Sequence, residues 1–370
     1  MKLLVQPIDG IAPLNQAIVK ARRSVDIVIF RCDRKDLERE LQRAVARGVT
    51  VRALIACLNR GGEKELRKLE MRLLQAGVTV ARTADDLVRY HDKFMIIDRK
   101  TLYVLAFNFT HLDIDHSRSF GVATRDRPTV KEALKLFEAD AQRRCYLPAL
   151  DDLVVSPGNA RQRLASFIRG AKRRLLIYDP RISDATMIRL LAERARQGVE
   201  IRIVGRLTRR IENVQVRRPF IRLHTRTIVR DRSEVFVGSQ SLSDVELDLR
   251  REVGLIVHNR KLVDRVIKTF EEDWSRDAHA TGSLAQEGST STVKATKKAV
   301  KAIARELPPM APILEEAVRK VVGDDADVNL DRKGVEETVR GALKEAVREV
   351  VKEAVQDVVG QEELTERVPG

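Results

Sequence analysis

Hydrophobic and polar positions along the chain follow one pattern twice. Residues 21–56 contain an apolar run typical of a strand, an amphipathic helical stretch, and then a second β-branched strand. Residues 172–206 repeat the same order. Gly48 and Gly198 stand where each helix is expected to end, at a position that favours the left-handed conformation. The pattern therefore predicts the internal duplication of a strand–helix–strand unit.

Strands that alternate with helices predict an α/β fold with mixed, largely parallel sheets. We expect two similar lobes packed together, formed by residues 1–148 and 149–275. Residues 276–292 are small and polar, which predicts a flexible linker. Residues 293–370 place Val and Ala at helical spacing among charges, which predicts a C-terminal helical tail for oligomerisation or partner binding.

Two short motifs at equivalent positions of the repeats carry the candidate chemistry. Residues 91–98 and 224–231 both have the form His-x-Lys/Arg-x4-Asp. Each motif overlaps an apolar stretch typical of a strand, where side chains two residues apart point the same way. Each histidine should therefore project beside its own cation. A nitrogen nucleophile next to a positive charge is suited to attack on a phosphate ester.

The spacing downstream of the motifs also agrees between the two halves. Asn108 follows the first histidine at the same separation at which Ser241 follows the second. Further along the chain, Ser119 and Glu252 are again equally spaced from their respective histidines. The matched motifs and spacings make His91, Lys93, Asp98, Asn108, His224, Arg226, Asp231, Ser241 and Glu252 candidate site residues.

The distribution of charge favours an anionic substrate. The chain has a formal net charge of +15, yet from Arg276 onward it contains 15 Lys and Arg against 18 Asp and Glu. The positive excess, about +18, therefore lies in residues 1–275. Eight arginines between residues 202 and 226 are either a solvated basic face or a track for phosphates. The sequence contains neither an apolar run of about 20 residues nor a signal-peptide pattern, so we expect a cytoplasmic protein. Its positive charge also allows peripheral contact with an anionic membrane.

The paired motifs resemble those of the phospholipase D superfamily, over about residues 1–275. That resemblance implies cleavage or transfer of a phosphodiester through a phosphohistidine intermediate, without a metal or an organic cofactor. It also implies that His91 is the nucleophile and His224 the acid/base, with Lys93 and Arg226 holding the phosphate oxygens. By the same resemblance we expect Asp98 and Asp231 to complete the catalytic set, and Asn108, Ser239, Ser241 and Glu252 to bind the substrate. The residues alone leave the reverse assignment of the two histidines open.

The chain departs from the family pattern in both halves. Asp113 or Asp115 could orient a histidine in place of the acid that is usual at position 119. Arginine is not equivalent to lysine at a phosphate site, because its planar fork differs from a compact ammonium. The departures are Ala106, Ser119, Arg226 and Ser241.

Three functions follow from this reading. The first is a phospholipid phosphodiesterase or phosphatidyltransferase, similar to the cardiolipin-synthase-like members of the superfamily. The second is a phosphodiesterase nuclease acting on DNA or RNA, which the basic body favours. The third is a non-catalytic scaffold that binds phosphate. The anionic phosphodiester partner, phospholipid or nucleic acid, is common to the first two.

Overall fold

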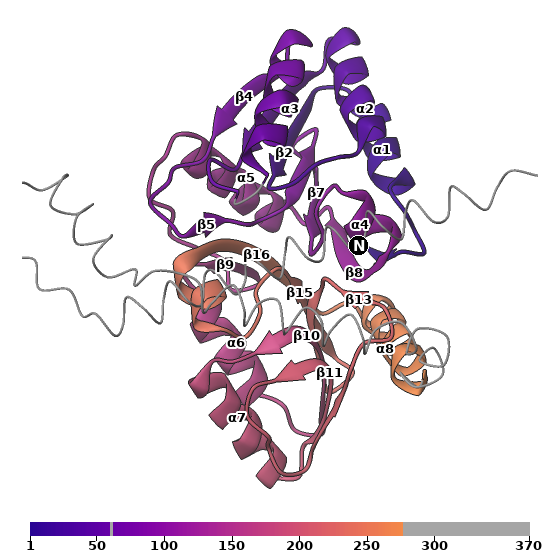
Figure 1. Ribbon diagram of the computed structural model, residues 1–370, viewed down its shortest axis with the longest axis vertical. Helices are drawn as coiled ribbons and strands as arrows, with labels where there is room; N and C mark the ends of the chain where they lie inside the picture. Colours follow the sequence, from indigo (N-terminus) through magenta and orange to yellow (C-terminus); the bar gives the residue numbers. More distant parts are fainter. Residues whose placement is uncertain (60–61, 277–370) are drawn as a thin grey trace, which may run out of the picture. The chain divides into compact units, whose positions relative to one another are not determined.

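A computed structural model describes residues 1–59 and 62–276. The helical tail predicted for residues 293–370 and nearly all of the predicted linker lie outside these residues. The described part consists of two lobes, each built on one mixed sheet (Figure 1). The fold is α/β with two similar lobes, as the repeated pattern predicts.

The first lobe carries a sheet with the strand order β1-β8-β7-β6-β2-β3-β4. Its strands are β1 (Lys2–Gln6), β2 (Ser24–Ile29), β3 (Thr50–Ile55), β4 (Thr79–Arg82), β6 (Phe94–Ile97), β7 (Thr101–Leu105) and β8 (Ser117–Thr124). Its helices are α1 (Ala12–Val19), α2 (Lys35–Ala46), α3 (Glu63–Gln75), α4 (His111–Asp115) and α5 (Arg127–Ala141). The short strand β5 (Arg89–Tyr90) leaves this lobe and joins the sheet of the other.

The second lobe repeats the arrangement with the order β12-β11-β10-β14-β15-β16. Its strands are β9 (Leu153–Ser156), β10 (Arg174–Ile182), β11 (Glu200–Leu207), β12 (Val214–Arg217), β13 (Arg222–Leu223), β14 (Arg226–Arg230), β15 (Glu234–Gly238) and β16 (Arg250–Val257). Its helices are α6 (Ala160–Arg169), α7 (Ala185–Arg196), the π-helix η1 (Val245–Leu249) and α8 (Arg260–Ser275). Strand β13 pairs with β8 of the first lobe.

Both sheets are mixed, but their parallel part is smaller than the strand–helix alternation suggests. Parallel pairing joins β2, β3 and β4 in one lobe, and β10, β11 and β12 in the other. The strands around the motifs pair antiparallel, because tight hairpins rather than helices connect β6 to β7 and β14 to β15. The expectation of largely parallel sheets is corrected accordingly.

The repeated helices form where the apolar pattern placed them. In α2, Leu37, Leu41 and Ala44 are buried at helical spacing against the sheet. Gly48 and Gly198 follow α2 and α7 with φ of +82° and +84°, a conformation that costs glycine little. The expected left-handed backbone conformation of these two glycines, just after each helix, is confirmed.

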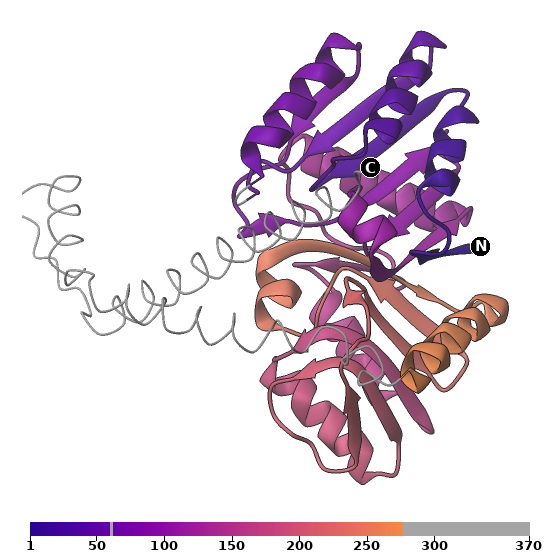
Figure 2. The same ribbon diagram turned by 45° about the vertical axis from the view of Figure 1, so that its right-hand side comes forward.

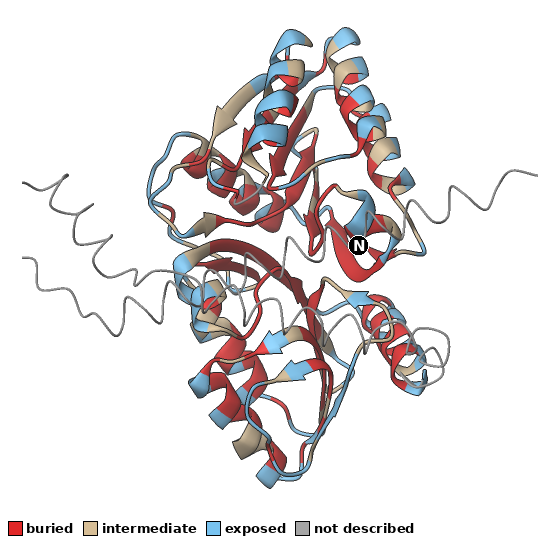
Figure 3. Cartoon of the chain, in the orientation of Figure 1, coloured by how far each residue is buried: buried red, intermediate tan, exposed pale blue. Residues whose placement is uncertain are grey.

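Three groups of buried apolar residues hold the lobes together. One lies between the first sheet and helices α1, α2 and α3, and a second lies between the second sheet and helices α6 and α7. The third is shared, because it contains residues of both sheets together with α5 and α8. Helix α8 lies on the opposite side of the second sheet from α6 and α7 (Figures 1 and 2). The strands between the lobes are buried accordingly (Figure 3).

No helix within residues 1–59 and 62–276 is both long enough and apolar enough to cross a bilayer.

Candidate active site

An exchange of short strands brings the two motifs together. Strand β5 directly precedes His91 and pairs with β16 of the second lobe, and His91 N–H donates to the Arg251 carbonyl at 2.8 Å. In the same way β13 precedes His224 and pairs with β8 of the first lobe, and His224 N–H donates to the Arg118 carbonyl at 3.0 Å. Each histidine is therefore anchored to the last strand of the opposite lobe.

His91 is held between an acid and a cation. Its Nδ1 lies 3.0 and 2.9 Å from the two carboxylate oxygens of Glu252. On the other side, Lys93 Nζ donates to His91 Nε2 at 3.0 Å and to the His91 carbonyl at 2.5 Å. Nδ1 therefore carries the proton that Glu252 accepts, and the lone pair of Nε2 faces away from the carboxylate.

His224 has a weaker set of partners at the equivalent nitrogen. Its Nδ1 donates to the Ala106 carbonyl at 3.0 Å and lies 3.4 Å from Asp113 Oδ2. A carbonyl oxygen can only accept, so Nδ1 carries the proton and Nε2 has the lone pair. Of the two acids proposed to orient a histidine, Asp113 is the one beside His224. Asp115 instead pairs with Arg34 and His111.

Ser119 explains why a substitute acid is needed. It stands at the position equivalent to Glu252, but its hydroxyl donates to the His224 carbonyl at 3.0 Å and does not reach the ring. Asp113 comes from α4, whose first turn is capped by Thr110. It also accepts from the Asn108 amide at 2.7 Å and from Arg222 at 2.6 Å. These bonds fix the carboxylate next to the ring.

The two motif cations are buried and differently partnered. Lys93 is 1% exposed, whereas Arg226 is 9% exposed. Arg226 Nε donates to Ser241 Oγ at 3.0 Å, and its Nη2 donates to Glu246 at 3.2 Å. Glu246 also accepts from the Ser241 backbone N–H at 2.6 Å. These bonds orient the guanidinium toward the centre from the second lobe.

Glu246 is a site residue that sequence reasoning missed, although its spacing gave a usable signal. Asp113 follows the first histidine at the same separation at which Glu246 follows the second. Both acids accept from the backbone N–H of the residue five positions before them, which is Asn108 in one half and Ser241 in the other. The duplicated frame thus extends to a second pair of acids.

Burial controls the protonation of the centre. Burial and the nearby Lys93 charge lower the pKa of His91, and burial lowers that of His224 to about 3. Burial also lowers the pKa of Lys93 to about 7. The pKa of Glu252 is raised by burial, against the effect of the neighbouring cations. Both imidazoles are therefore neutral at pH 7, as a nitrogen nucleophile requires.

Asp98 and Asp231 do not lie in this centre. Asp98 follows β6 and Asp231 follows β14, each in the tight turn of a hairpin, with φ of 54° and 50°. Asp98 accepts from the backbone N–H groups of residues 22–24, at 2.7 to 3.1 Å. Asp231 accepts in the same way from residues 172–174, at 2.7 to 2.9 Å. The structure does not bring these two aspartates to the histidines; they tie the motif hairpin to the start of β2 or β10.

The expected substrate-binding residues also divide into two groups. Asn108 lines the cavity beside the histidines, and Ser241 and Glu252 bond to the motif side chains. Ser239 bonds to the backbone of Val253 and so joins β15 to β16, and its side chain also hydrogen-bonds to Glu252. It therefore supports the acid beside His91 from behind and is not among the residues that line the cavity.

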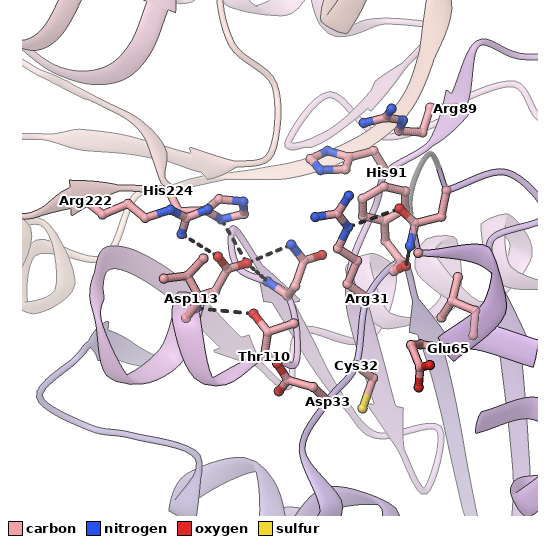
Figure 4. A pocket seen from close by; sticks show the side chains of 16 residues that line it. Arg31, Cys32, Asp33, Glu65, Arg89, His91, Thr110, Asp113, Arg222 and His224 are labelled. Carbon is pink, nitrogen blue, oxygen red and sulfur yellow. Dashed lines mark hydrogen bonds and ion pairs between the residues drawn. The ribbon is translucent and has the colours of Figure 1, made fainter. Parts of the chain in front are cut away.

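Both histidines line one cavity of about 370 Å³ (Figure 4). The walls come mainly from the first lobe, from the ends of β2 and β3 and from α3, β5 and α4. Arg222 and His224 are the contributions of the second lobe. The cavity joins two neutral imidazoles, and the motif cations Lys93 and Arg226 lie next to it. This arrangement can hold a phosphodiester, attack it with one imidazole and exchange a proton with the other once that second ring has taken up a proton.

Proteins of known sequence that resemble this chain include mitochondrial cardiolipin hydrolases. The protein from Canis lupus familiaris is 32% identical over 134 residues, which is 35% of this chain and 50% of the relative. The protein from Mus musculus is also 32% identical over 134 residues, which is 57% of its length. The chain therefore spans about half the length of these relatives.

Solved structures share the fold at low identity. Polyphosphate kinase from Porphyromonas gingivalis has a TM-score of 0.62 with 19% identity, over 75% of this chain and 50% of that chain. Phosphatidylserine synthase from Haemophilus influenzae has a TM-score of 0.55 with 9% identity, over 74% of this chain and 86% of that chain. At these identities the likeness concerns the fold.

The family described as "Cardiolipin synthase, PLD-like domain" matches residues 14–141 and 164–274. These two segments include both histidine motifs and together make up more than half of the chain. The chain belongs to this cardiolipin synthase-like, phospholipase D-like family of phosphodiesterases and phosphatidyltransferases.

Proposed function

We propose that this protein hydrolyses or transfers a phospholipid phosphodiester through a phosphohistidine formed on His91. The observation that carries the proposal is the pair of neutral imidazoles, each protonated at Nδ1, that line one cavity next to Lys93 and Arg226. Neutral Nε2 atoms supply the nucleophile and the base, and the two cations offset the charge of the transition state.

His91 is the better nucleophile because a carboxylate supports it. As Nε2 bonds to phosphorus, the ring becomes positive, and Glu252 at 2.9 Å from Nδ1 stabilises that charge. The bond from phosphorus to the leaving oxygen breaks, and this oxygen takes a proton from His224 Nε2. The anionic substrate raises the pKa of His224 enough for that proton to be present. In the second step water or an alcohol gives its proton to His224, attacks phosphorus and breaks the P–N bond.

Two of the departures from the family pattern, Ser119 and Arg226, have a compensating neighbour. Asp113 takes the place next to His224 that Ser119 leaves without an acid. Ser241 and Glu246 hold the longer Arg226 side chain. Buried charges need partners in any folded protein, but an acid beside each imidazole is what acid/base chemistry requires and a phosphate-binding scaffold does not. The arrangement supports an enzyme over a binding scaffold.

The surroundings of the cavity favour phospholipid over nucleic acid. Among the described residues, Phe30 is the one Phe, Tyr or Trp that lines the cavity, and at 2% exposure it offers little surface for stacking on a base. Leu112, which lines the cavity, is 46% exposed, and Leu58 and Val88 are exposed beside its lining residues. Apolar side chains next to arginines suit contact with an anionic lipid surface. We therefore propose peripheral binding to such a membrane.

A burst assay with bis(p-nitrophenyl) phosphate tests the mechanism. The p-nitrophenolate leaving group needs little protonation, so His224→Ala should still release one p-nitrophenol per enzyme and then stop. His91→Ala should release none, and His258→Ala, a surface control paired with Asp152, should turn over normally. The trapped phosphate should map to His91. A burst from His91→Ala would refute this mechanism. Parallel assays with phospholipid vesicles and with single- and double-stranded DNA would identify the substrate class.

A further inference from the structure

Each motif histidine is anchored to the backbone of a buried arginine from the opposite lobe. The His91 N–H donates to the carbonyl of Arg251 on β16, and the His224 N–H donates to the carbonyl of Arg118 on β8. Both arginines are only 5% exposed. A buried guanidinium needs partners for its charge and for its N–H groups. The partners of these two arginines therefore influence where the histidines are held.

The guanidinium of Arg118 bonds back into the second lobe. Its Nε and Nη2 donate to the two carboxylate oxygens of Asp273 on α8, at 2.7 and 2.9 Å. Tyr178 on β10 donates to the same carboxylate at 2.6 Å, and Arg118 Nη1 donates to the Gln6 carbonyl at 2.7 Å. A bidentate pair restricts both the distance and the angle between its two groups. Strand β8 of the first lobe is thus tied to α8 and β10 of the second.

Arg251 makes the reciprocal connection. Its Nη2 donates to Asp140 Oδ1 on α5 of the first lobe at 3.0 Å. Its Nη1 donates to the carbonyls of Ser156 and Pro157 at 3.3 and 3.4 Å. Asp140 is 1% exposed and lies in the last turn of α5, as Asp273 lies in the last turn of α8. Both ion pairs therefore cross between the lobes, in opposite directions.

The Arg118 pair (Arg118 and Asp273) and the Arg251 pair (Arg251 and Asp140) belong to the duplicated frame. Arg118 follows the first histidine at the same separation at which Arg251 follows the second. Asp140 and Asp273 are likewise equally spaced from their histidines. Buried ion pairs add little net stability, because the loss of hydration offsets much of their attraction. A geometric requirement therefore explains better than stability why both halves contain such a pair.

We propose that the Arg251 pair positions His91 and that the Arg118 pair positions His224, so that both imidazoles meet one phosphorus. None of the four side chains of the pairs lines the cavity, so they act through the histidine backbone and do not touch substrate. Such an effect can be large, because a misplacement of about 1 Å can cost roughly 10²-fold in rate. This inference rests on the proposed function, because it concerns the same two histidines.

Replacing each pair with apolar side chains of similar size tests the proposal. R251M/D140L and R118M/D273L each remove a buried pair together, an exchange that often leaves stability unchanged or higher. Arg251→Lys and Arg118→Lys are milder variants that keep the charge but lose the planar fork. They should show the same division between the two histidines with smaller changes.

The matched control is R52M/D26L. Arg52 donates to Asp26 at 2.6 Å between β3 and β2, and Asp26 is 0% exposed, but this pair lies within one lobe and anchors no histidine. Hydrogen exchange of backbone N–H groups, followed by NMR, needs no turnover. Loss of the Arg251 pair should speed exchange at His91 about tenfold more than at His224, and loss of the Arg118 pair should do the reverse. The control should change neither by more than about twofold.

Kinetics with bis(p-nitrophenyl) phosphate then separates the two pairs by reaction step. With enzyme in excess, loss of the Arg251 pair should slow release of the first p-nitrophenol roughly 10-fold to 100-fold, because His91 makes the attack. Loss of the Arg118 pair should leave this release within about threefold but slow steady-state turnover roughly 10-fold to 100-fold, because His224 serves the second step.

Three results would overturn the positioning role. They are equal changes of exchange at both histidines in the two double variants, changes of the same size in the control, and equal slowing of the first release in both. Each would show that the pairs only hold the lobes together. If the exchange pattern is as expected but the unmodified chain turns over no diester, the proposed function fails and the positioning role stands.

Discussion

The two halves of the active site share one frame but support their histidines differently. His91 rests against the Glu252 carboxylate at 2.9 Å, whereas His224 donates to the Ala106 carbonyl and has its acid, Asp113, at 3.4 Å. A carboxylate stabilises a positive ring far better than a carbonyl does. Under the proposed mechanism, this difference suits His91 to hold positive charge and His224 to exchange protons.

The cations differ in a complementary way. In the first half Lys93 bonds to His91 and Asn108 bonds to Asp113, whereas in the second half Arg226 and Ser241 bond to each other. Because residues 226 and 241 are in direct contact, the substitutions at these two positions read best as one coordinated exchange. They do not indicate independent decay of the motif.

Removing the charge of each acid should give the largest difference between the two halves. Glu252→Gln keeps the shape beside His91 but cannot stabilise the positive ring, and kcat should fall roughly 10²–10³-fold. Asp113→Asn should cost only about 10-fold, because the Ala106 carbonyl still orients His224. Steady-state kinetics with a chromogenic diester measures both. A greater loss in Asp113→Asn would reverse the assignment of nucleophile and acid/base.

The two cations should also separate in their dependence on pH. The pKa of Lys93 is lowered to about 7 by burial, whereas the pKa of Arg226 is raised because Glu246 and Glu252 outweigh the opposing effect of burial. As pH rises above about 7, Lys93 loses its proton, so kcat/KM should fall by about tenfold per pH unit.

Variants that exchange lysine and arginine at positions 93 and 226 provide the control for this fall of kcat/KM at alkaline pH. Lys93→Arg should remove the alkaline fall even if its maximal rate is lower, because arginine keeps its charge. Arg226→Lys should add a second alkaline fall, since a lysine in this buried position would also titrate early. Profiles of log kcat/KM from pH 6 to 10 decide the matter. An alkaline limb that persists unchanged in Lys93→Arg would contradict the role given to Lys93.

The sequence was informative wherever a pattern extended over many residues. The strand–helix repeats appear as β2-α2-β3 and β10-α7-β11, and the motif spacing brought Asn108, Ser241 and Glu252 to the centre. The strand exchange was not predictable, because β5 and β13 are two residues long and have no periodicity of their own. Pairing across lobes is decided by tertiary packing.

Aspartate at the end of each motif shows a second limit of sequence reasoning. The common spacing of Asp98 and Asp231 indicated a shared role but not which role. Their positive φ and their bonds to backbone N–H groups exist only once the hairpin is formed. Residues that recur in a catalytic motif can be needed for the strands that carry it. Only the position in space separates the two cases.

A buried charge in the first half has a neutral counterpart in the second, which predicts a difference in stability. Asp92 is 1% exposed, its two oxygens have no hydrogen-bond partner among the described residues, and it lies near Asp140 and Arg251. The equivalent Thr225 shares a hydrogen bond with Thr227 at 2.9 Å. Burial, followed by the Asp140 charge, raises the pKa of Asp92 to about 7.

Because the pKa of this acid is higher in the folded protein than in the unfolded chain, its cost to stability grows as pH rises from about 4 to 7 and persists above that. Asp92→Asn should therefore raise the free energy of unfolding by about 2 to 4 kcal/mol at pH 8. The gain should vanish below about pH 4. Urea denaturation at both pH values provides the measurement, with Thr225→Val as a control that should lose about 1 kcal/mol. A gain for Asp92→Asn that is independent of pH would show that ionisation is not the cause.

The smallest effect should be the same in both lobes. Asp98 and Asp231 each have a pKa lowered by backbone N–H groups, although partial burial acts in the opposite direction. An acid with a lowered pKa stabilises the fold above its unfolded pKa and loses this effect as pH falls. Asp98→Asn and Asp231→Asn should each lower the free energy of unfolding by only about 1 to 2 kcal/mol at pH 7, because one side-chain oxygen still accepts from the backbone. Near pH 3 the loss should be smaller, because the wild-type carboxylate is then partly protonated. The kcat of each variant should stay within about twofold, since neither carboxylate lies at the centre. A loss of kcat beyond about tenfold, in a variant that remains folded by circular dichroism, would show that these aspartates take part in catalysis. Both halves would then contribute an equivalent acid to the reaction.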